Sequence, residues 1–209
     1  RLADLRFLEL AHIYVNELGT KGRWHEAAAD AAAFVKEQPD NPALYHTLAP
    51  LLVADKDIQN YRDLCRQIIP HFGHTQDVPT ADQMAKDCLI LPSSGADMQA
   101  VGALADVAVT RGKNSVSYPF FECCKALAEY RQEHFAEAVK WAGSAVKNSF
   151  PYSRAEGYAI LAMAQWQSGQ TNEAHAAWAN CDQVIKEKLP KLSNGNLGMD
   201  WRDWIIAHA

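Results

Sequence analysis

The stretch RWHEAAADAAAFVKEQPDNP, residues 23–42, decides the fold of this chain. Its many alanines have a high propensity for helix and let a neighbouring helix approach closely. Pro39 and Pro42 then bracket Asp40 and Asn41, a pattern typical of a turn that ends one helix and starts the next. The stretch therefore predicts a helix, a short polar turn and the start of a second helix.

Two later stretches repeat this pattern. They are EHFAEAVKWAGSAVKNSFP, residues 133–151, and GQTNEAHAAWANCDQVIKEKLP, residues 169–190. Each of the three stretches has a Glu-Ala pair near its start and another packing residue seven positions after that alanine. Seven residues make two helical turns, so both positions lie on one face. The pairs are Ala27 with Phe34, Ala138 with Ala145, and Ala174 with Cys181. The chain therefore contains an internal repeat.

The repeat period is about 34 residues and is longer in the later repeats. Tyr61 lies 34 residues after Ala27, Val101 lies 40 after Tyr61, Ala138 lies 37 after Val101, and Ala174 lies 36 after Ala138. Helical spacing appears almost everywhere and strand alternation almost nowhere, so we expect an all-α chain. The first helices of five pairs are expected at about 2–18, 42–54, 79–91, 117–132 and 153–168, and their partners at about 22–37, 57–71, 97–111, 134–148 and 171–188.

The period and the small residues resemble the tetratricopeptide repeat (TPR) family. Ala126 and Ala162 lie twelve residues before Ala138 and Ala174, which places a small residue on each first helix opposite the second helix. The second and third pairs depart from this pattern with larger residues. The resemblance implies one domain over 1–209, a right-handed α-α superhelix (a TPR-like solenoid). It would contain helix pairs at about 1–38, 42–72, 79–112, 117–149 and 152–189 and a capping helix from 199.

A narrower similarity lies in residues 48–92 and in DWRDWIIAHA, residues 200–209. The residues that carry it are Tyr61, Arg62, Leu64, Cys65, Phe72, Gly73, Thr75, Thr80, Ala81, Ala85, Lys86, Cys88, Leu89, Leu91, Pro92, Asp200, Trp201, Asp203, Trp204 and Ala207. They resemble the helical-repeat region that follows the catalytic domain in many large bacterial serine/threonine protein kinases. The resemblance covers about 42–209. In that family the last helix runs on, so we expect this chain to be a piece of a longer protein.

Composition and charge argue against several classes of protein. Hydrophobic residues make up 48% of the chain, charged residues 22%, and the net charge is −5 without any block of like charge. A nucleic-acid surface would show clustered Lys and Arg, so no nucleic-acid partner is expected. No apolar run approaches the roughly 18 residues of a membrane span, so we expect no membrane contact from these residues. The five cysteines contain no CxxC pair, which favours reduced thiols and a cytoplasmic location.

Motifs of a catalytic or metal site are missing from the sequence. No HRD, DFG or APE motif is present, so this chain is expected not to be an enzyme, although the resemblance implies a kinase in the parent protein. We expect no cofactor and no metal. Cys123 and Cys124 could form a redox or metal site, but their side chains point about 100° apart on a helix, which favours packing. His71 and His74, with Asp77 nearby, could form a partial metal cluster, but turn and helix-end roles are favoured.

Aromatic residues near the ends of first helices are the best binding candidates, because first helices line the concave face in this architecture. Trp24, Trp141, Trp178, Trp201 and Trp204 are instead expected to fill gaps between stacked helices. The candidate protein-binding residues are Tyr130, Arg131, Trp166, Gln167, Met163, Leu127 and His46. Alternatively the rings of Tyr130 and Trp166 pack on the neighbouring pair, and only Arg131 and Gln167 reach solvent.

The leading functional hypothesis is a non-catalytic scaffold that binds a protein or peptide. The resemblance implies the regulatory or substrate-recruiting region of a bacterial serine/threonine kinase. The alternatives are self-association into a homodimer and a ligand-sensing helical-repeat domain of a bacterial transcription regulator. A further alternative is an enzyme that uses Cys123 or a metal site at His71 and His74.

Overall fold

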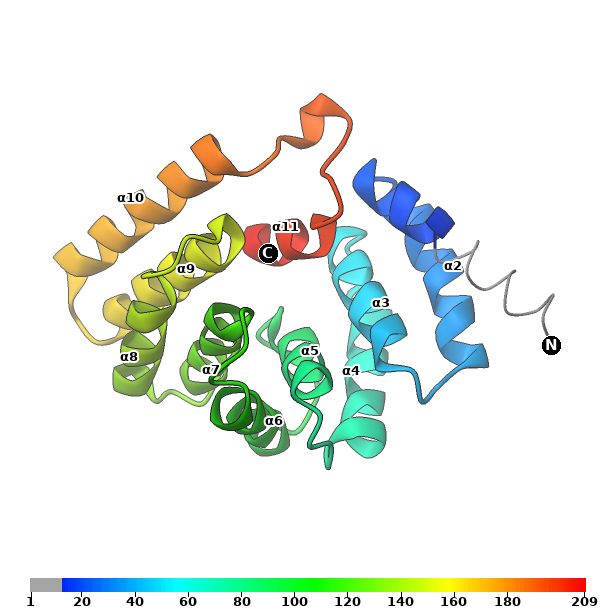
Figure 1. The fold of residues 1–209 in the computed structure, drawn as a ribbon, viewed down its shortest axis with the longest axis horizontal. Helices are drawn as coiled ribbons and strands as arrows, with labels where there is room; N and C mark the ends of the chain where they lie inside the picture. Colours follow the sequence, from blue (N-terminus) through cyan, green and yellow to red (C-terminus); the bar gives the residue numbers. More distant parts are fainter. Residues whose placement is uncertain (1–12) are drawn as a thin grey trace.

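The fold is entirely helical over the residues that the computed structural model describes, 13–209 (Figure 1). The helices are α2 (Trp24–Glu37), α3 (Pro42–Ala54), α4 (Ile58–Phe72), α5 (Val78–Leu89), α6 (Met98–Arg111), α7 (Tyr118–Arg131), α8 (Phe135–Ala145), α9 (Pro151–Gln167), α10 (Thr171–Lys188) and α11 (Trp201–His208), with a 3-10 turn at Leu192–Asn194. Residues 13–20 are also helical. From α2 onward the bounds lie within a few residues of those expected, while most of the expected helix 2–18 lies outside the described residues.

Side-chain caps and prolines fix where the helices begin. Asn41, Asp57, Asp77 and Asp97 accept hydrogen bonds from backbone N–H groups in the first turns of α3, α4, α5 and α6. Proline stands in the first two positions of α3, α5, α7 and α9, where its missing N–H would have no helical partner anyway. Pro50 lies inside α3, and the helix continues past it to Ala54.

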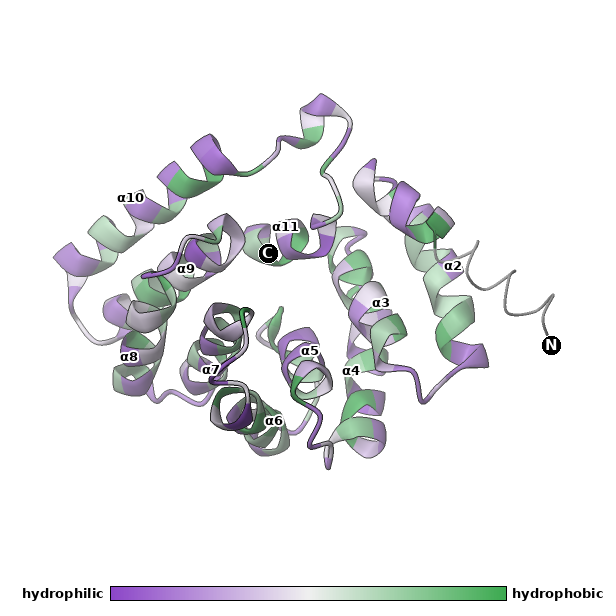
Figure 2. Ribbon diagram, in the orientation of Figure 1, coloured by the Kyte–Doolittle hydropathy of each residue, from purple (hydrophilic) through white to green (hydrophobic). Residues whose placement is uncertain are grey.

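The helix pairs stack side by side in an arc. Helices α3, α5, α7 and α9 each pack against the next and line the inner side, whereas α2, α4, α6, α8 and α10 form the outer layer (Figure 1). Purple and green residues alternate along α10 in Figure 2, as expected for an amphipathic helix with one face on α9. Among the described helices, none is long and apolar enough to cross a lipid bilayer.

The repeated position predicted from the sequence is the packing centre of every pair. Ala27, Tyr61, Val101, Ala138 and Ala174 are all at most 4% exposed. Tyr61 replaces the usual alanine without leaving a buried polar group unpaired. Its hydroxyl donates to the carbonyl of Asp87 at 2.8 Å and accepts from the backbone N–H of Leu91 at 3.2 Å. The register of the repeat is therefore confirmed.

The C-terminal segment returns to the beginning of the chain. We call residues 189–209 the C-terminal clasp; it leaves the end of α10, crosses the mouth of the arc and places α11 on the inner side, against α3 and α9 (Figure 1). The backbone N–H of Leu197 donates to the carbonyl of Thr20 at 2.8 Å. The expected last helix is thus present, and it lies in the hollow of the arc.

Trp201 anchors the clasp. Its side chain is fully buried, and its Nε1 donates to Asn16 Oδ1 at 3.3 Å. Gly19 provides the space, because a Cβ atom at this position would lie 2.5 Å from Trp201 Cε2. The ring of Trp24 lies 6.4 Å from the rings of both Trp201 and Trp204, centroid to centroid. Residues near both ends of the chain therefore share one aromatic cluster.

We expect Trp201→Ala to lower the free energy of unfolding by about 3–5 kcal/mol, because it removes a fully buried indole and leaves a cavity. The matched control is Trp178→Ala on α10, where the indole is 59% exposed; it should cost less than about 1 kcal/mol. Urea denaturation of both variants measures the difference. Equal losses of stability in the two variants would show that the clasp does not contribute to the fold.

Candidate binding site on the concave face

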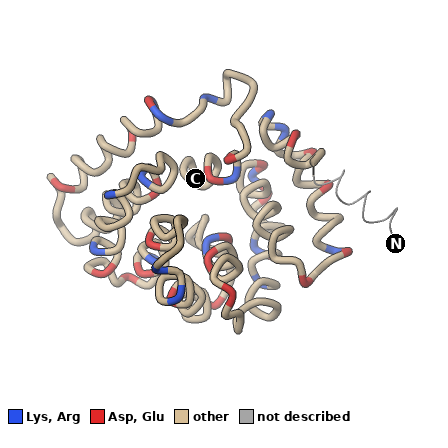
Figure 3. Tube along the Cα trace, viewed as in Figure 1, with Lys and Arg blue, Asp and Glu red and all other residues tan. Residues whose placement is uncertain are grey.

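A cavity of about 470 Å³ lies on the inner side of the arc, between α3, α5, α7 and α11. It extends from α11 to the turn between α6 and α7. It is lined by His46, Val78, Pro79, Asp82, Gln83, Lys86, Arg111, Gly112, Asn114, Ser115, Ser117, Phe120, Phe121 and Asp203. Figure 3 shows that charged residues of both signs occur on the inner helices and on α11. Charged, polar and apolar residues therefore share the lining of this cavity, which lies on the inner helices.

Lys86 occupies the inner end of this cavity. It is 5% exposed, its Nζ lies 3.3 Å from Asp82 Oδ2, and it stands 5.3 Å from the centroid of the Phe120 ring. Burial alone lowers the pKa of Lys86, but the neighbouring acidic groups, Asp82 first, outweigh this effect and raise it. Lys86 is therefore a buried, charged ammonium group.

Carboxyl groups surround Lys86 from three helices: Asp82 on α5, Glu156 on α9 and Asp203 on α11. Burial raises the pKa of Glu156 to about 8, Lys86 lowers it in part, and Asp203 adds to the rise. Glu156 is consequently protonated at neutral pH. One lysine carries too little positive charge to balance three ionised carboxylates near it, and the buried Glu156 therefore keeps its proton.

Two buried carboxyl oxygens in this group have no hydrogen-bond partner among residues 13–209, Asp82 Oδ1 and Glu156 Oε1. Their residues are 5% and 6% exposed. Buried polar atoms are nearly always paired in folded proteins, because an unpaired one costs about 1–3 kcal/mol. Asp82 lines the cavity, and its unpaired Oδ1 is itself buried in the cavity wall.

His46 is the candidate residue from the sequence that the structure places in this cavity. Its Nδ1 lies 2.9 Å from Oδ1 of the fully buried Asp87. Burial raises the pKa of Asp87, and the neighbouring His46 lowers it in part. His46 therefore stands at the wall of the cavity, held by a carboxyl group behind it.

The other candidate residues lie farther along α7 and α9. Leu127, Tyr130 and Met163 pack against the core between α7, α8 and α9, and the Tyr130 ring also lies 5.7 Å from that of Phe135. Arg131 is half-buried and donates from Nη2 to the backbone carbonyls of Leu89 and Ile90 at 3.3 and 3.5 Å.

Trp166 and Gln167 are exposed at the end of α9, where Trp166 meets the edge of His175. The alternative in which both rings pack on the neighbouring pair is therefore wrong for Trp166, which is 57% exposed, whereas Tyr130 does pack on its neighbours. The partner-binding role of these residues remains a prediction.

One expectation about the tryptophans is wrong. Trp178 does not fill a gap between helices, since it is 59% exposed. The positions that match it in α2, α4, α6 and α8 are Ala31, Cys65, Ala105 and Ala142, and all are buried. Among residues 13–209 no further helix pair packs on α10 to cover this position, which explains the exposure.

The structure bears on the alternative sites at Cys123 and Cys124 and around His71. All five cysteines are free and buried, and burial raises the pKa of the Cys123 and Cys124 thiols, which makes them poor nucleophiles. His71 pairs with Asp40 at 3.3 Å, and Asp77 caps α5. Within the described part of the chain, no group of three or more His, Cys, Asp or Glu residues is placed to hold a metal ion.

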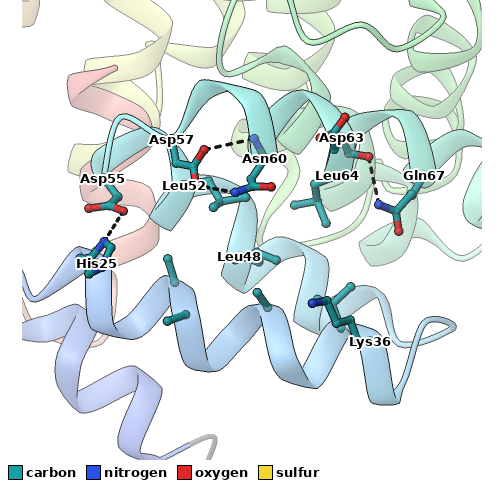
Figure 4. A pocket seen from close by; sticks show the side chains of 14 residues that line it. His25, Lys36, Leu48, Leu52, Asp55, Asp57, Asn60, Asp63, Leu64 and Gln67 are labelled. Atoms are coloured by element: carbon teal, nitrogen blue, oxygen red, sulfur yellow. Dashed lines mark hydrogen bonds and ion pairs between the residues drawn. The ribbon is translucent and has the colours of Figure 1, made fainter.

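A second hollow, of about 370 Å³, lies on the outer side between α2 and α4 (Figure 4). Leu48, Leu52 and Leu64 are among the apolar residues that line it. The polar residues around it satisfy one another: His25 Nδ1 lies 2.9 Å from Asp55 Oδ2, Asn60 donates to Asp57 at 2.6 Å, and Gln67 donates to the carbonyl of Asp63 at 3.1 Å. Since its polar groups are paired locally, this groove is the weaker candidate.

Comparisons with known proteins agree with this architecture. No protein-family model and no curated protein matches the chain. Among solved structures, the nearly identical TPR-like repeats of a kinesin light chain from Podosopora anserina align with a TM-score of 0.57 at 19% identity, over 86% of this chain and 95% of that one. MamA from Desulfovibrio magneticus RS-1 aligns with a TM-score of 0.53 at 10% identity, over 86% and 96%.

The fold is a TPR-like solenoid. At these identities the likeness extends to the fold alone. Residues missed by sequence reasoning, Asp82, Lys86 and Asp203, give the concave cavity of this solenoid its charge. The sequence feature that could have indicated these residues is the spacing of four between Asp82 and Lys86, which puts both side chains on one helix face.

Glu156 should make the stability of the solenoid fall as pH rises. The folded chain keeps this proton up to about pH 8, whereas an exposed glutamate releases it near 4.5, so the folded state binds more protons between these values. We expect Glu156→Gln to flatten the dependence between pH 5 and 8, by at most about 1.4 kcal/mol per pH unit for one proton. The pKa of Asp87 is raised as well, but Asp87 is present in both the unmodified chain and the variant, so it does not contribute to the difference between them.

Denaturant titrations at pH 5, 6, 7 and 8 measure this effect. Glu137→Gln, at an exposed glutamate of α8, is the matched control and should keep the slope of the unmodified chain. An unchanged slope in Glu156→Gln would mean that Glu156 is ionised at neutral pH.

Proposed function

We propose that this chain is a non-catalytic protein-binding module that holds a peptide segment of a partner in the concave cavity. The observation that carries the proposal is the cavity of about 470 Å³ between the inner helices and α11, which both charged and apolar residues line. Stacked helix pairs offer such inner surfaces because each pair shields its neighbour's apolar face and leaves the other side of the first helices open. Helix α11 adds a wall that repeats alone would not supply.

The finer proposal is that the chain recruits a substrate or a regulator for a catalytic domain of a bacterial serine/threonine kinase. The resemblance of residues 42–209 to the repeat region of such kinases supports it. Recruitment works by positioning, since a partner held on a tethered module reaches a high effective concentration at the catalytic site. Five buried, free cysteines support the expected cytoplasmic location.

A displayed library of random 12-residue peptides, panned against the purified chain, tests this function. We expect selected peptides to shift NMR signals of residues that line the cavity. Asn114→Trp adds bulk at the exposed rim of the cavity and should weaken binding about tenfold or more. Asn172→Trp makes the same change at an exposed position of α10 and should leave the affinity unchanged.

Trp166 and Gln167 form a proposed second contact for longer partners. In the same assay Trp166→Ala should weaken selected peptides by a smaller factor than Asn114→Trp, because Trp166 lies outside the cavity. Selection of no peptide at all, or of peptides that bind Asn114→Trp as tightly as the unmodified chain, would contradict the proposed function.

Self-association is a second candidate function, favoured by one observation. Trp166 and Trp178 are 57% and 59% exposed at the α9–α10 end of the arc, and exposed tryptophans are enriched at the centres of protein interfaces. This hypothesis predicts a molar mass by light scattering that rises with concentration, and a constant monomer mass in Trp178→Gln. A monomer mass at every concentration of the unmodified chain would contradict the self-association hypothesis.

A further inference from the structure

The inner end of the concave cavity combines acidic groups with space for another group. Asp82 and Asp203 both line the cavity. Asp82 uses Oδ2 for Lys86 and keeps Oδ1 unpaired, while Asp203 forms no salt bridge among residues 13–209. Glu156 lies behind them with its own unpaired oxygen. The site thus has more acceptors than the donors that face them.

The other cations nearby are already engaged or lie at the rim. Arg202 donates from Nη1 to Asn16 Oδ1 at 3.0 Å and stands 5.0 Å from the centroid of the Trp201 ring. His46 is bound to Asp87. Arg111 is exposed at the C-terminal end of α6, at the opposite end of the cavity from α11. None of the three forms a hydrogen bond or salt bridge with Asp82 or Asp203 among the described residues.

We propose that the inner end of the cavity binds a cationic side chain, the ammonium of a lysine or the guanidinium of an arginine in a bound peptide. The proposal rests on the proposed function and names the chemistry of the partner. The carboxylate of Asp203 accepts charge-assisted hydrogen bonds from the cation, and the buried carboxylate of Asp82 turns its unpaired Oδ1 toward the cavity to accept a further one. The occupant is a side chain of the bound peptide.

The arrangement also explains why Lys86 does not exclude a second cation. Lys86 is committed to Asp82 Oδ2 and to the face of Phe120, so its charge is already offset. A second positive charge faces Asp203 and the protonated Glu156. Its arrival lowers the pKa of Glu156, so that binding releases a proton from a group that no ligand atom needs to touch.

Three blocked tripeptides test the proposal on the unmodified chain: Ac-Gly-Arg-Gly-NH2, Ac-Gly-Lys-Gly-NH2 and the uncharged citrulline analogue Ac-Gly-Cit-Gly-NH2. In 15N NMR titrations we expect both cationic peptides to shift the amide signals of Asp82, Gln83, Phe120 and Asp203 with millimolar affinity. The citrulline peptide should bind at least tenfold more weakly, and 0.5 M salt should weaken the cationic peptides because it screens charge.

Variants locate the site. Asp82→Asn and Asp203→Asn keep the side-chain shape and should each weaken the arginine peptide about tenfold. Asp63→Asn removes an acidic charge from the outer side of α4 and is the matched control, with unchanged affinity expected. Amide spectra of all three variants check the fold, and the citrulline comparison needs no variant at all.

Several outcomes would overturn the proposal: equal binding of the citrulline peptide, shifts that map outside the cavity, or no shifts at 50 mM arginine peptide. Library peptides that occupy the cavity without enrichment of Lys or Arg would also reject it, while leaving the proposed function intact. Binding of the arginine peptide without selection of any library peptide would support the cation site and contradict the proposed peptide-binding function.

Discussion

The structure depends on one constraint: a pair of helices cannot bury its own apolar face, so the next pair must cover it. Small or closely packed residues at the repeated position, such as Ala27, Val101 and Ala138, allow that close approach. Repeating the contact produces the arc, and the arc separates an outer layer from an inner surface (Figure 1). The concave cavity is a product of the same constraint, because it lies among the helices that face inward.

The helices and their register could be predicted from the sequence because they depend on local information. Alanine content, proline at helix starts and the spacing of Ala27, Ala138 and Ala174 determine them within the reach of a few turns. The path of the C-terminal clasp could not be predicted in this way. It depends on Trp201 meeting Gly19, a contact between residues from opposite ends of the chain that no periodic pattern encodes.

The candidate site likewise contains a part that local sequence information predicts and a part that it does not. His46 could be placed on the concave face from helical spacing alone. The charged residues that give the cavity its chemistry were missed, because Asp82, Glu156 and Asp203 come together around Lys86 from three different helices, which no local pattern encodes. Trp178 was misread for a related reason: its position is buried in every preceding pair, and only the end of the array leaves it uncovered.

The C-terminal clasp changes how cooperatively the helix pairs unfold. In an open row of repeats, the outermost units fray first and stability accumulates unit by unit, as in a one-dimensional chain of neighbours. Here the last helix contacts the first described one, so the two ends of the described row are joined through the clasp. Separating α2 from α11 must break the shared aromatic cluster, which couples the first and last described helices. Such a molecule should also complete its folding late, since the contact of longest sequence separation closes only after the final residues have been synthesised.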